Sequence, residues 1–477
     1  MSSPSWPSAP QAPAADVLSE VLAAARAGVD PERASAESLD VHAEPGSGVP
    51  VLTGELATWD DVVRAGHAAA AAWVTLRNDN PGDVVVDISP EQSEPASVGA
   101  ARVSLHTQEI PDSADVVVIG AGICGMATAF ALARAGLGVA VLDSASRIGE
   151  MTTSWNNGMV HPGHDPKPGT LKALLNIRGN AEWSELMQAL GLFFERRASL
   201  VVGFGDADDA RLEGLLSKAQ VNGVPGAELI SGDRAREVEP RLSAAISGAL
   251  YLPTTASIDP VMVAESLAAK LRGLGGTVSL LTEVSAITVE SGRVTGVQVG
   301  ERHVAAPLVI NAAGVYADVL AATAGSRRYS IHPRRGSLML FDPGADDRYR
   351  TSVWQVPGAY SKGCGMTARP SGFTTGGPTA VEQQSRTSLP PTQAEIDDIL
   401  AAAERIYPAY PVGSIVHVGS AVRAVTYSED FVIGPAPGII GLMDVAGTQS
   451  PAIAAAPAIA DYVVDALRRI GYLPDPT

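Results

Sequence analysis

The segment Ala114-Asp-Val-Val-Val-Ile-Gly-Ala-Gly-Ile-Cys-Gly125, followed by Val139-Ala-Val-Leu-Asp143, predicts the fold of this chain. It reads as an apolar strand, a glycine-rich turn, an alanine-rich helix, a second strand and a terminal acid. This order is typical of the βαβ unit that binds the ADP part of a dinucleotide. A glycine turn in an ordinary βαβ unit is the alternative.

Each residue type in this segment has a physical purpose. Gly120 allows the tight turn, Gly122 lets the backbone approach a pyrophosphate, and Gly125 lets the helix lie close to the strand. The helix N-terminus then faces the phosphates. Asp143 ends the second strand, where a carboxylate can accept hydrogen bonds from the ribose hydroxyls. The context therefore favours a nucleotide site over a bare glycine turn.

Composition limits the classes of partner. The chain has 477 residues, 46% of them hydrophobic, which suggests two or three domains with a large core. Its formal net charge of −18 and its lack of Lys/Arg clusters argue against nucleic acid and against anionic membrane surfaces. With only Cys124 and Cys364, a disulfide framework, a zinc site and a cysteine-ligated iron–sulfur cluster are not expected.

The sequence also predicts a location. The N-terminus lacks a basic segment followed by an apolar run, and no stretch reaches the eighteen or so apolar residues of a spanning helix. Two cysteines in this length fit a reducing compartment. We therefore expect no spanning membrane segment, no metal site and a cytoplasmic protein.

Residues 1–112 differ from the rest and form an N-terminal extension. Residues 1–15 are rich in Pro, Ser and Ala and are expected to be disordered, whereas residues 16–27 have helical apolar spacing. Thr58 resembles the cap of a helix that runs through Trp73, and residues 83–88 resemble a strand. The extension is interpreted as a tether, a small accessory module or an interface arm.

Strands and helices alternate from Asp115 onward. Four short segments, 277–281, 286–290, 294–298 and 301–305, resemble a β-meander. We expect a mixed α/β (α+β) fold in which a Rossmann-type nucleotide-binding domain is interleaved with a β-sheet substrate domain. The expected ranges are 113–190, 254–329 and 416–471 for the first domain, and 191–253 and 330–415 for the second.

A second nucleotide-type element lies near the C-terminus. Gly441-Leu-Met-Asp-Val-Ala-Gly447 reads as a strand that ends in glycine, followed by residues 448–451 and a helix from about Pro457 to Ile470. Backbone N–H groups near a helix start would stabilise the negative charge that a reduced flavin carries at N1–C2. A terminal helix that only packs is the alternative.

Several segments together resemble one family. They include Thr153-Ser-Trp-Asn-Asn-Gly-Met-Val-His-Pro-Gly163, Asn311-Ala-Ala-Gly-Val-Tyr-Ala-Asp318 and Gly447-Thr-Gln-Ser-Pro-Ala-Ile-Ala-Ala-Ala-Pro457. Over about 113–470 the chain is similar to flavoproteins of the D-amino-acid oxidase superfamily. Within it, the chain resembles the branch of FAD-dependent glycerol-3-phosphate dehydrogenases and L-2-hydroxyglutarate oxidases.

The resemblance implies bound FAD and hydride transfer from a secondary alcohol or amine carbon to flavin N5. It implies cofactor contacts from twelve positions: Gly120, Gly122, Gly125, Asp143, Ser154, Asn157, Asn311, Ala312, Gly314, Gly447, Ser450 and Pro451. The chain departs from the branch at Ser337-Leu338, at Ala452-Ile453 and around Arg423, so the resemblance does not specify the substrate.

Alcohol oxidation needs a base for the hydroxyl proton, and imidazole titrates near working pH. His161 follows the Asn-rich segment and is the candidate base, with a structural or flavin-contacting histidine as the alternative. His164 is expected to be more exposed, and His332 to be structural. An anionic substrate needs a fixed cation, for which Arg423 is the first candidate.

Arg369 and Lys362 are further cation candidates, while Arg334 and Arg335 are expected to hold domains together. The favoured function is an FAD-dependent oxidoreductase that oxidises a small polar 2-hydroxy acid or polyol phosphate. An amine or amino-acid oxidase is the alternative, and a non-catalytic flavin-binding assembly or sensor component is a third reading. Oxygen, a quinone or a carrier protein could each accept the electrons.

Overall fold

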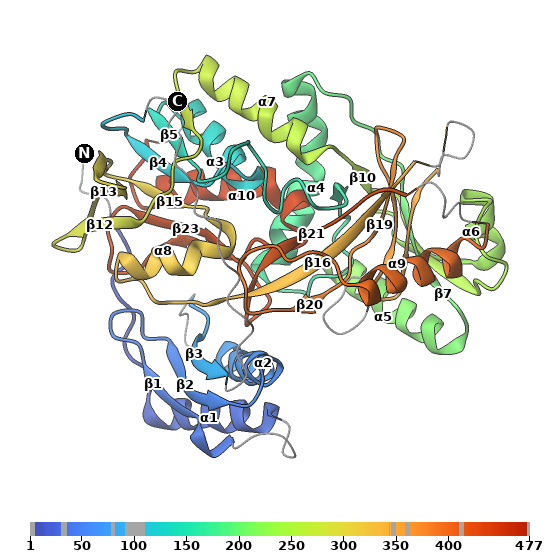
Figure 1. Cartoon of the computed structure of the whole chain (residues 1–477), viewed down its shortest axis with the longest axis horizontal. Coiled ribbons are helices and arrows are strands. Elements are labelled where there is room, and N and C mark those ends of the chain that lie inside the picture. The colour runs from blue at the N-terminus through green and yellow to red at the C-terminus, as the bar shows by residue number, and fades with distance from the viewer. Residues whose placement is uncertain are drawn as a thin grey trace.

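A computed structural model describes residues 5–29, 36–77, 82–90, 110–342, 344, 350–357, 363–409 and 415–474. The mixed α/β fold expected from the sequence is confirmed. Figure 1 shows the N-terminal residues as a separate blue layer against one side of the remaining chain. Among the described residues, no helix combines the length and sustained hydropathy that crossing a bilayer requires.

The predicted βαβ unit forms the centre of a six-stranded sheet. The order is β11 (Thr277–Ser279), β5 (Val139–Leu142), β4 (Val116–Ile119), β15 (Val309–Asn311), β23 (Leu442–Ala446) and β22 (Val432–Pro435). All neighbours are parallel except β22 and β23. The buried strands are almost wholly apolar, as expected for a parallel sheet covered on both faces.

Helices and a small sheet cover the two faces. One face packs against α3 (Ile123–Arg134), α4 (Leu171–Leu190), α7 (Pro260–Gly273) and α10 (Ala452–Arg469). The other faces α8 (Ala317–Thr323) and a meander of β12 (Ala286–Glu290), β13 (Arg293–Val299) and β14 (Arg302–Ala305). The two faces of the sheet therefore differ in their cover.

Two sequence predictions about these elements are wrong. Residues 277–279 do not belong to the meander, because β11 pairs in parallel with β5 at the sheet edge. The C-terminal helix begins at Ala452 and not near Pro457, which lies inside α10. The earlier start brings the helix N-terminus directly after Pro451.

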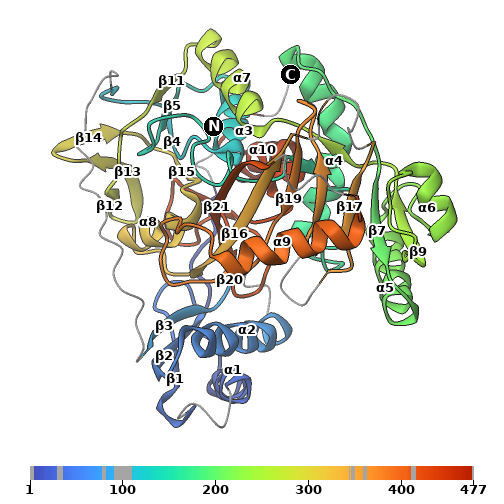
Figure 2. The ribbon, with the colours of Figure 1, turned by 45° about the vertical axis from the view of Figure 1, so that its right-hand side comes forward.

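A second, nine-stranded sheet lies beside the first (Figure 2). Its order is β20 (Val381–Glu382), β16 (Ile331–Phe341), β19 (Thr374–Gly377), β18 (Gly365–Ala368), β17 (Ser352–Gln355), β7 (Ser199–Gly203), β9 (Gly248–Leu252) and β8 (Glu228–Ser231), and β21 (Ile415–Thr426) pairs with β16. Helix α9 (Gln393–Ile406) crosses one face, while α5 (Asp206–Asn222) and α6 (Gly232–Val238) flank the far end.

Strands from both predicted substrate segments therefore share one sheet. Strand β21 joins them although its residues fall mainly in the range expected for the nucleotide-binding domain. The long β16–β21 ribbon carries Arg334 opposite Arg423. A two-stranded pair of β6 (Met159–Val160) and β10 (Ala256–Ser257) holds the segment that precedes His161. The proposed domain boundaries themselves stay a prediction.

The N-terminal residues form a folded module. It contains α1 (Ala15–Gly28), a 3-10 turn (Ala36–Ser38), β1 (Asp40–Ala43), β2 (Pro50–Leu56), α2 (Trp59–Leu76) and β3 (Val85–Pro90). Thr58 accepts a hydrogen bond from the backbone N–H of Asp61, so the predicted helix cap is confirmed. We call the described residues between 5 and 90 the N-terminal module.

The module packs on the rest of the chain. Residues 5–7 were expected to be disordered, but they contact the C-terminal part of the chain. The Trp6 indole donates a hydrogen bond to Ala436 O at 2.8 Å, and Ser5 N donates one to Ile470 O at 2.8 Å. Tyr427, which follows β21, belongs to the buried core of the module. At Gly66 of α2, an added Cβ would lie 2.2 Å from Cε1 of Tyr427.

Gly66→Ala is expected to loosen this contact and lower the free energy of unfolding by about 1–3 kcal/mol, because the buried Tyr427 ring cannot move aside. Gly214→Ala is the matched control. It makes the same change inside α5, where an added Cβ meets nothing within 4 Å, and should stabilise by roughly 0.5–1 kcal/mol. Denaturant unfolding measures both, and equal effects would contradict the packing argument.

Candidate active site

The glycine turn between β4 and α3 leaves no room for side chains at two positions. Gly120 has a φ of +109°, and a Cβ there would lie 2.4 Å from Ala312 O. A Cβ at Gly125 would lie 2.0 Å from Gly120 O, so α3 crosses the turn in direct contact. The N–H of Ile123 is held by Oγ1 of Thr153 at 3.0 Å. The turn is thus fixed from both sides.

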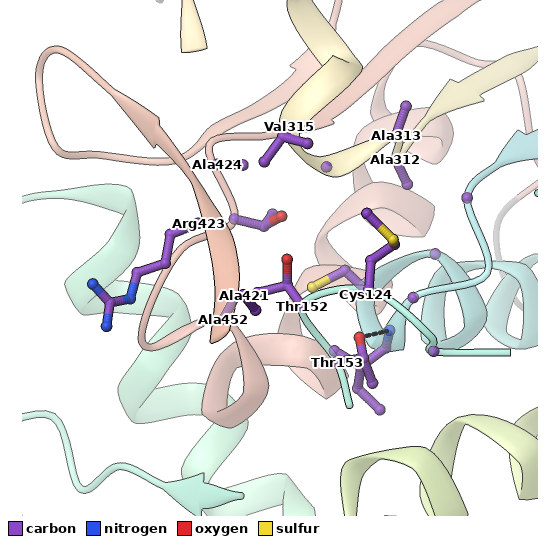
Figure 3. A pocket seen from close by; sticks show the side chains of 18 of the residues that line it. Cys124, Thr152, Thr153, Ala312, Ala313, Val315, Ala421, Arg423, Ala424 and Ala452 are labelled. Carbon is purple, nitrogen blue, oxygen red and sulfur yellow. Dashed lines mark hydrogen bonds between the residues drawn. The ribbon is translucent and has the colours of Figure 1, made fainter. Parts of the chain in front are cut away.

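A cavity of about 1040 Å³ opens beside this turn. Figure 3 shows its wall at close range, with Cys124, Thr152, Thr153 and Ala452 labelled around the same space. Of the site residues predicted from the sequence, eleven line it: Gly120, Gly122, Gly125, Asp143, Asn157, His161, Ala312, Gly314, Arg423, Ser450 and Pro451. The chain therefore brings residues from both ends of the flavoprotein-like region to one cavity.

Three predicted residues lie behind the wall. Asn311 is fully buried, and its Nδ2 donates to Ala317 O at 2.8 Å and to Oδ1 of Asp444 at 3.1 Å. The Ser154 hydroxyl donates to Met151 O at 2.9 Å. Gly447 has a φ of +67°. These residues shape the segments that form the wall, and none of them lines the cavity.

Asp143 is held in place by the glycine turn. Its Oδ2 accepts from Ala121 N at 2.5 Å and its Oδ1 from Ala145 N at 2.7 Å. The carboxylate still lines the cavity. Asp143 thus lies in the position where a carboxylate that binds ribose hydroxyls is expected.

The residues present fit a flavin dinucleotide. At Gly122 an added Cβ would meet only Oγ1 of Thr153, at 3.3 Å, and at Gly314 it would meet nothing within 4 Å. The space before the N-terminus of α3 is therefore open to a pyrophosphate, which the helix dipole favours. The first residues of α10, Ala452 and Ile453, also line the cavity. They would provide a positive helix end for the reduced flavin, whose negative charge lies at N1–C2.

His161 lies on the wall of the same cavity. Its Nε2 is 3.4 Å from the Ser450 hydroxyl, and its backbone O accepts from the side chains of Asn176 and Asn180 at 2.8 and 3.0 Å. The imidazole is thereby held at the cavity beside the turn that precedes α10. His164, expected to be more exposed, is instead buried and does not line this cavity. The preceding Gly163 has a φ of +103°, and a Cβ there would lie 2.2 Å from Cδ1 of Ile177, so the chain is closely packed at this point.

Arg423 contributes a cation to the wall. Its NH2 donates to Thr379 O at 2.8 Å, and burial, followed by the charge of Arg334, lowers the pKa of the guanidinium to about 10. It therefore stays protonated at neutral pH. In Figure 3 its side chain points away from Cys124 and Thr153.

The neighbouring arginines differ from Arg423. Arg335 pairs with Glu395 at 2.8 Å and Arg334 with Glu429 at 2.8 Å, whereas within the described part of the chain no carboxylate lies within ion-pair distance of Arg423. Arg369 donates to Thr375 and Asn156 and does not line the cavity. Lys362 lies outside the described residues.

Sequence reasoning missed two tryptophans of the wall, Trp155 in the Asn-rich segment and Trp354 in β17. Thr448 and Gln449, which belong to the segment 447–451 that the resemblance places along the cofactor, line the cavity before α10. Trp155 and the 448–449 pair lie inside motifs that had been recognised, so a signal was present. Cys124 also lines the cavity, but burial raises the pKa of its thiol to about 12, so it is a neutral thiol at physiological pH.

Comparisons with known proteins identify the family. Residues 115–466 match the family model for FAD dependent oxidoreductases, abbreviated DAO. A glycerol 3-phosphate dehydrogenase from Caloramator mitchellensis is 33% identical over 356 residues, which cover 75% of this chain and 74% of the relative. A mitochondrial L-2-hydroxyglutarate dehydrogenase from Pongo abelii is 28% identical, covering 75% of this chain and 88% of the relative.

A solved structure shows the same architecture. The dithionite-reduced L-α-glycerophosphate oxidase of Mycoplasma pneumoniae, with FAD bound, superposes with a TM-score of 0.71 at 25% identity, over 75% of this chain and 95% of that protein. The family match, over residues 115–466, contains the six-stranded sheet, the nine-stranded sheet and every predicted site residue. The N-terminal module lies outside this match. The chain therefore belongs to the family of FAD-dependent oxidoreductases, and its cofactor is FAD.

Proposed function

We propose that this chain oxidises the secondary alcohol of a small anionic hydroxy compound, either a 2-hydroxy acid or a polyol phosphate. One observation carries the proposal: Arg423 is a partly buried guanidinium on the cavity wall with a single hydrogen bond, to Thr379 O, among the described residues. A partly desolvated charge without a counter-ion is unfavourable, and a carboxylate or phosphate of the substrate would compensate it.

The chain's own residues have separate tasks in this reaction. His161 would accept the hydroxyl proton at Nε2, Arg423 would bind the anionic group, and Trp354 would help to exclude water from the cavity. FAD, when bound, supplies a two-electron acceptor for the hydride of the donor carbon. Loss of one proton and one hydride converts CH–OH to C=O. The glycerol 3-phosphate and L-2-hydroxyglutarate relatives support this class of donor.

Arg423→Leu is expected to raise KM for an anionic hydroxy donor roughly ten- to hundredfold, the effect of removing one charge-assisted contact, with a smaller change in kcat. Steady-state dye reduction with glycerol 3-phosphate and L-2-hydroxyglutarate measures it. Arg234→Leu is the control, because Arg234 is 63% exposed and pairs only with Glu237 among the described groups. An unchanged KM in the Arg423 variant would refute the anion-binding role.

The reduced cofactor must pass its electrons on, and oxygen, a quinone or a carrier protein is proposed as the acceptor. Peroxide formation in air would identify an oxidase, whereas turnover only with a quinone or dye would identify a dehydrogenase. An amine donor would need no hydroxyl base, so rapid reduction by amino acids would favour the amine-oxidase alternative. A cytoplasmic location is likewise proposed, on the low cysteine content.

A further inference from the structure

The N-terminal module grips a short loop that lies directly after the strand carrying Arg423. The His67 ring bonds Tyr427 O through Nδ1 at 2.7 Å, and the Asp83 carboxylate accepts from Ser428 N at 2.9 Å. Together with the Tyr427 ring in the module core, these contacts hold consecutive residues of the loop. We call residues 427–430 the gripped loop.

Glu429 is the centre of this loop and has an unusual backbone conformation. Its φ is +61°, a left-handed value that residues other than glycine rarely adopt. Cations from two other elements surround its carboxylate: Arg334 of β16 at 2.8 Å and Lys172 of α4 at 3.9 Å. Burial alone would raise the pKa of Glu429, but these charges hold it well below its ordinary value. The carboxylate is therefore charged.

Glu429 also reaches the cavity wall. Its Oε2 accepts a hydrogen bond from the side-chain amide of Gln449, which lines the cavity before α10. The next residue, Ser450, places its hydroxyl 3.4 Å from Nε2 of His161. A Cβ at Gly447 would lie 3.0 Å from Asp430 O, so the turn before α10 rests against the gripped loop. One carboxylate thus connects the module to the turn that faces the flavin.

The same cluster has the donor set of a metal site, since single ligand atoms of His67, His332 and Glu429 lie within 4.8 Å of one another. The guanidinium of Arg334 already occupies this space, 2.8 Å from Oε1 of Glu429 and 3.5 Å from Nε2 of His67. Its fixed positive charge opposes a second cation there. The arrangement fits an arginine-centred network better than a metal ion.

We propose that Glu429 is a positioning residue that fixes the turn 448–451 for the flavin and for His161, and that the N-terminal module holds Glu429 in place. The module contributes no described residue to the cavity wall itself. It acts through the gripped loop. The part of the inference that concerns His161 rests on the proposed function. The part that concerns FAD does not, because fixing the turn before the N-terminus of α10 requires no particular substrate.

Glu429→Gly in the full-length chain tests this role cleanly, because glycine adopts φ +61° without strain and only the side chain is lost. We expect the Kd of FAD for the apoprotein to rise about tenfold, the effect of one charge-assisted hydrogen bond, with a changed flavin absorbance spectrum. Glu429→Gln keeps an acceptor for Gln449 and should restore most of the affinity, within about threefold of the wild type. Fluorescence titration of FAD measures both.

Glu382→Gln is the matched control, because Glu382 also pairs with Arg334 and with His332 Nδ1 at 2.9 Å but has no hydrogen bond to Gln449 within the described part of the chain. It should leave the FAD Kd within twofold even if it lowers the melting temperature. Unchanged FAD affinity in Glu429→Gly, or equal weakening by Glu382→Gln, would overturn the proposal. The titration contains no substrate, so its result is independent of whether hydroxy acids are oxidised.

Discussion

Gly122→Leu is expected to yield colourless protein. The side chain would project from the start of α3 into the open space where only Oγ1 of Thr153 lies within 4 Å of a Cβ, and this is the space that the pyrophosphate needs. Overpacking typically costs about 1–3 kcal/mol, so FAD affinity should fall by roughly ten- to hundredfold or more. The ratio of flavin to protein absorbance after purification measures the loss.

Gly214→Leu is the control for this change, because an added Cβ there meets nothing within 4 Å and the position lies in α5, away from the cavity. It should retain FAD. If Gly122→Leu kept full flavin content, or if the wild-type chain remained colourless after reconstitution with FAD, the pyrophosphate placement would be wrong.

His161→Ala is expected to slow flavin reduction by around 10² to 10⁴, because proton transfer by a positioned base contributes about that much. The KM for the donor should change less, since Arg423 remains to bind the anion. Rapid-mixing measurement of flavin reduction without oxygen isolates the chemical step. His303→Ala is the control, because His303 lies on β14 and bonds Thr288, away from the cavity.

The glycine turn and the class of cofactor could be predicted from the sequence, because the residue types of the glycine motif depend directly on local backbone geometry. Gly120 and Gly125 are the positions where a side chain would clash with the backbone, so the presence of glycine at both positions predicts the turn. Resemblance of a segment, in contrast, does not give the direction of each side chain. Asn311 and Ser154 lie in the expected segments but point into internal hydrogen bonds and not into the cavity.

Long-range pairing was harder to predict. Residues 277–279 have the same apolar character as the meander strands that follow, and only the three-dimensional fold brings them beside β5. The cluster of His67, His332 and Glu429 joins residues hundreds of positions apart, without a local pattern. The contact between Tyr427 and the N-terminal module could not be predicted from the sequence for the same reason.

We propose that Arg423 and His161 serve the oxidation of an anionic hydroxy compound by bound FAD. Stopped-flow reduction of the flavin under anaerobic conditions, with L-2-hydroxyglutarate, glycerol 3-phosphate and a set of amino acids as donors, tests these two roles. We expect a hydroxy donor to reduce the flavin fastest and His161→Ala to slow this step by at least about a hundredfold. Fastest reduction by an amino acid, at a rate that His161→Ala leaves unchanged, would contradict this proposal.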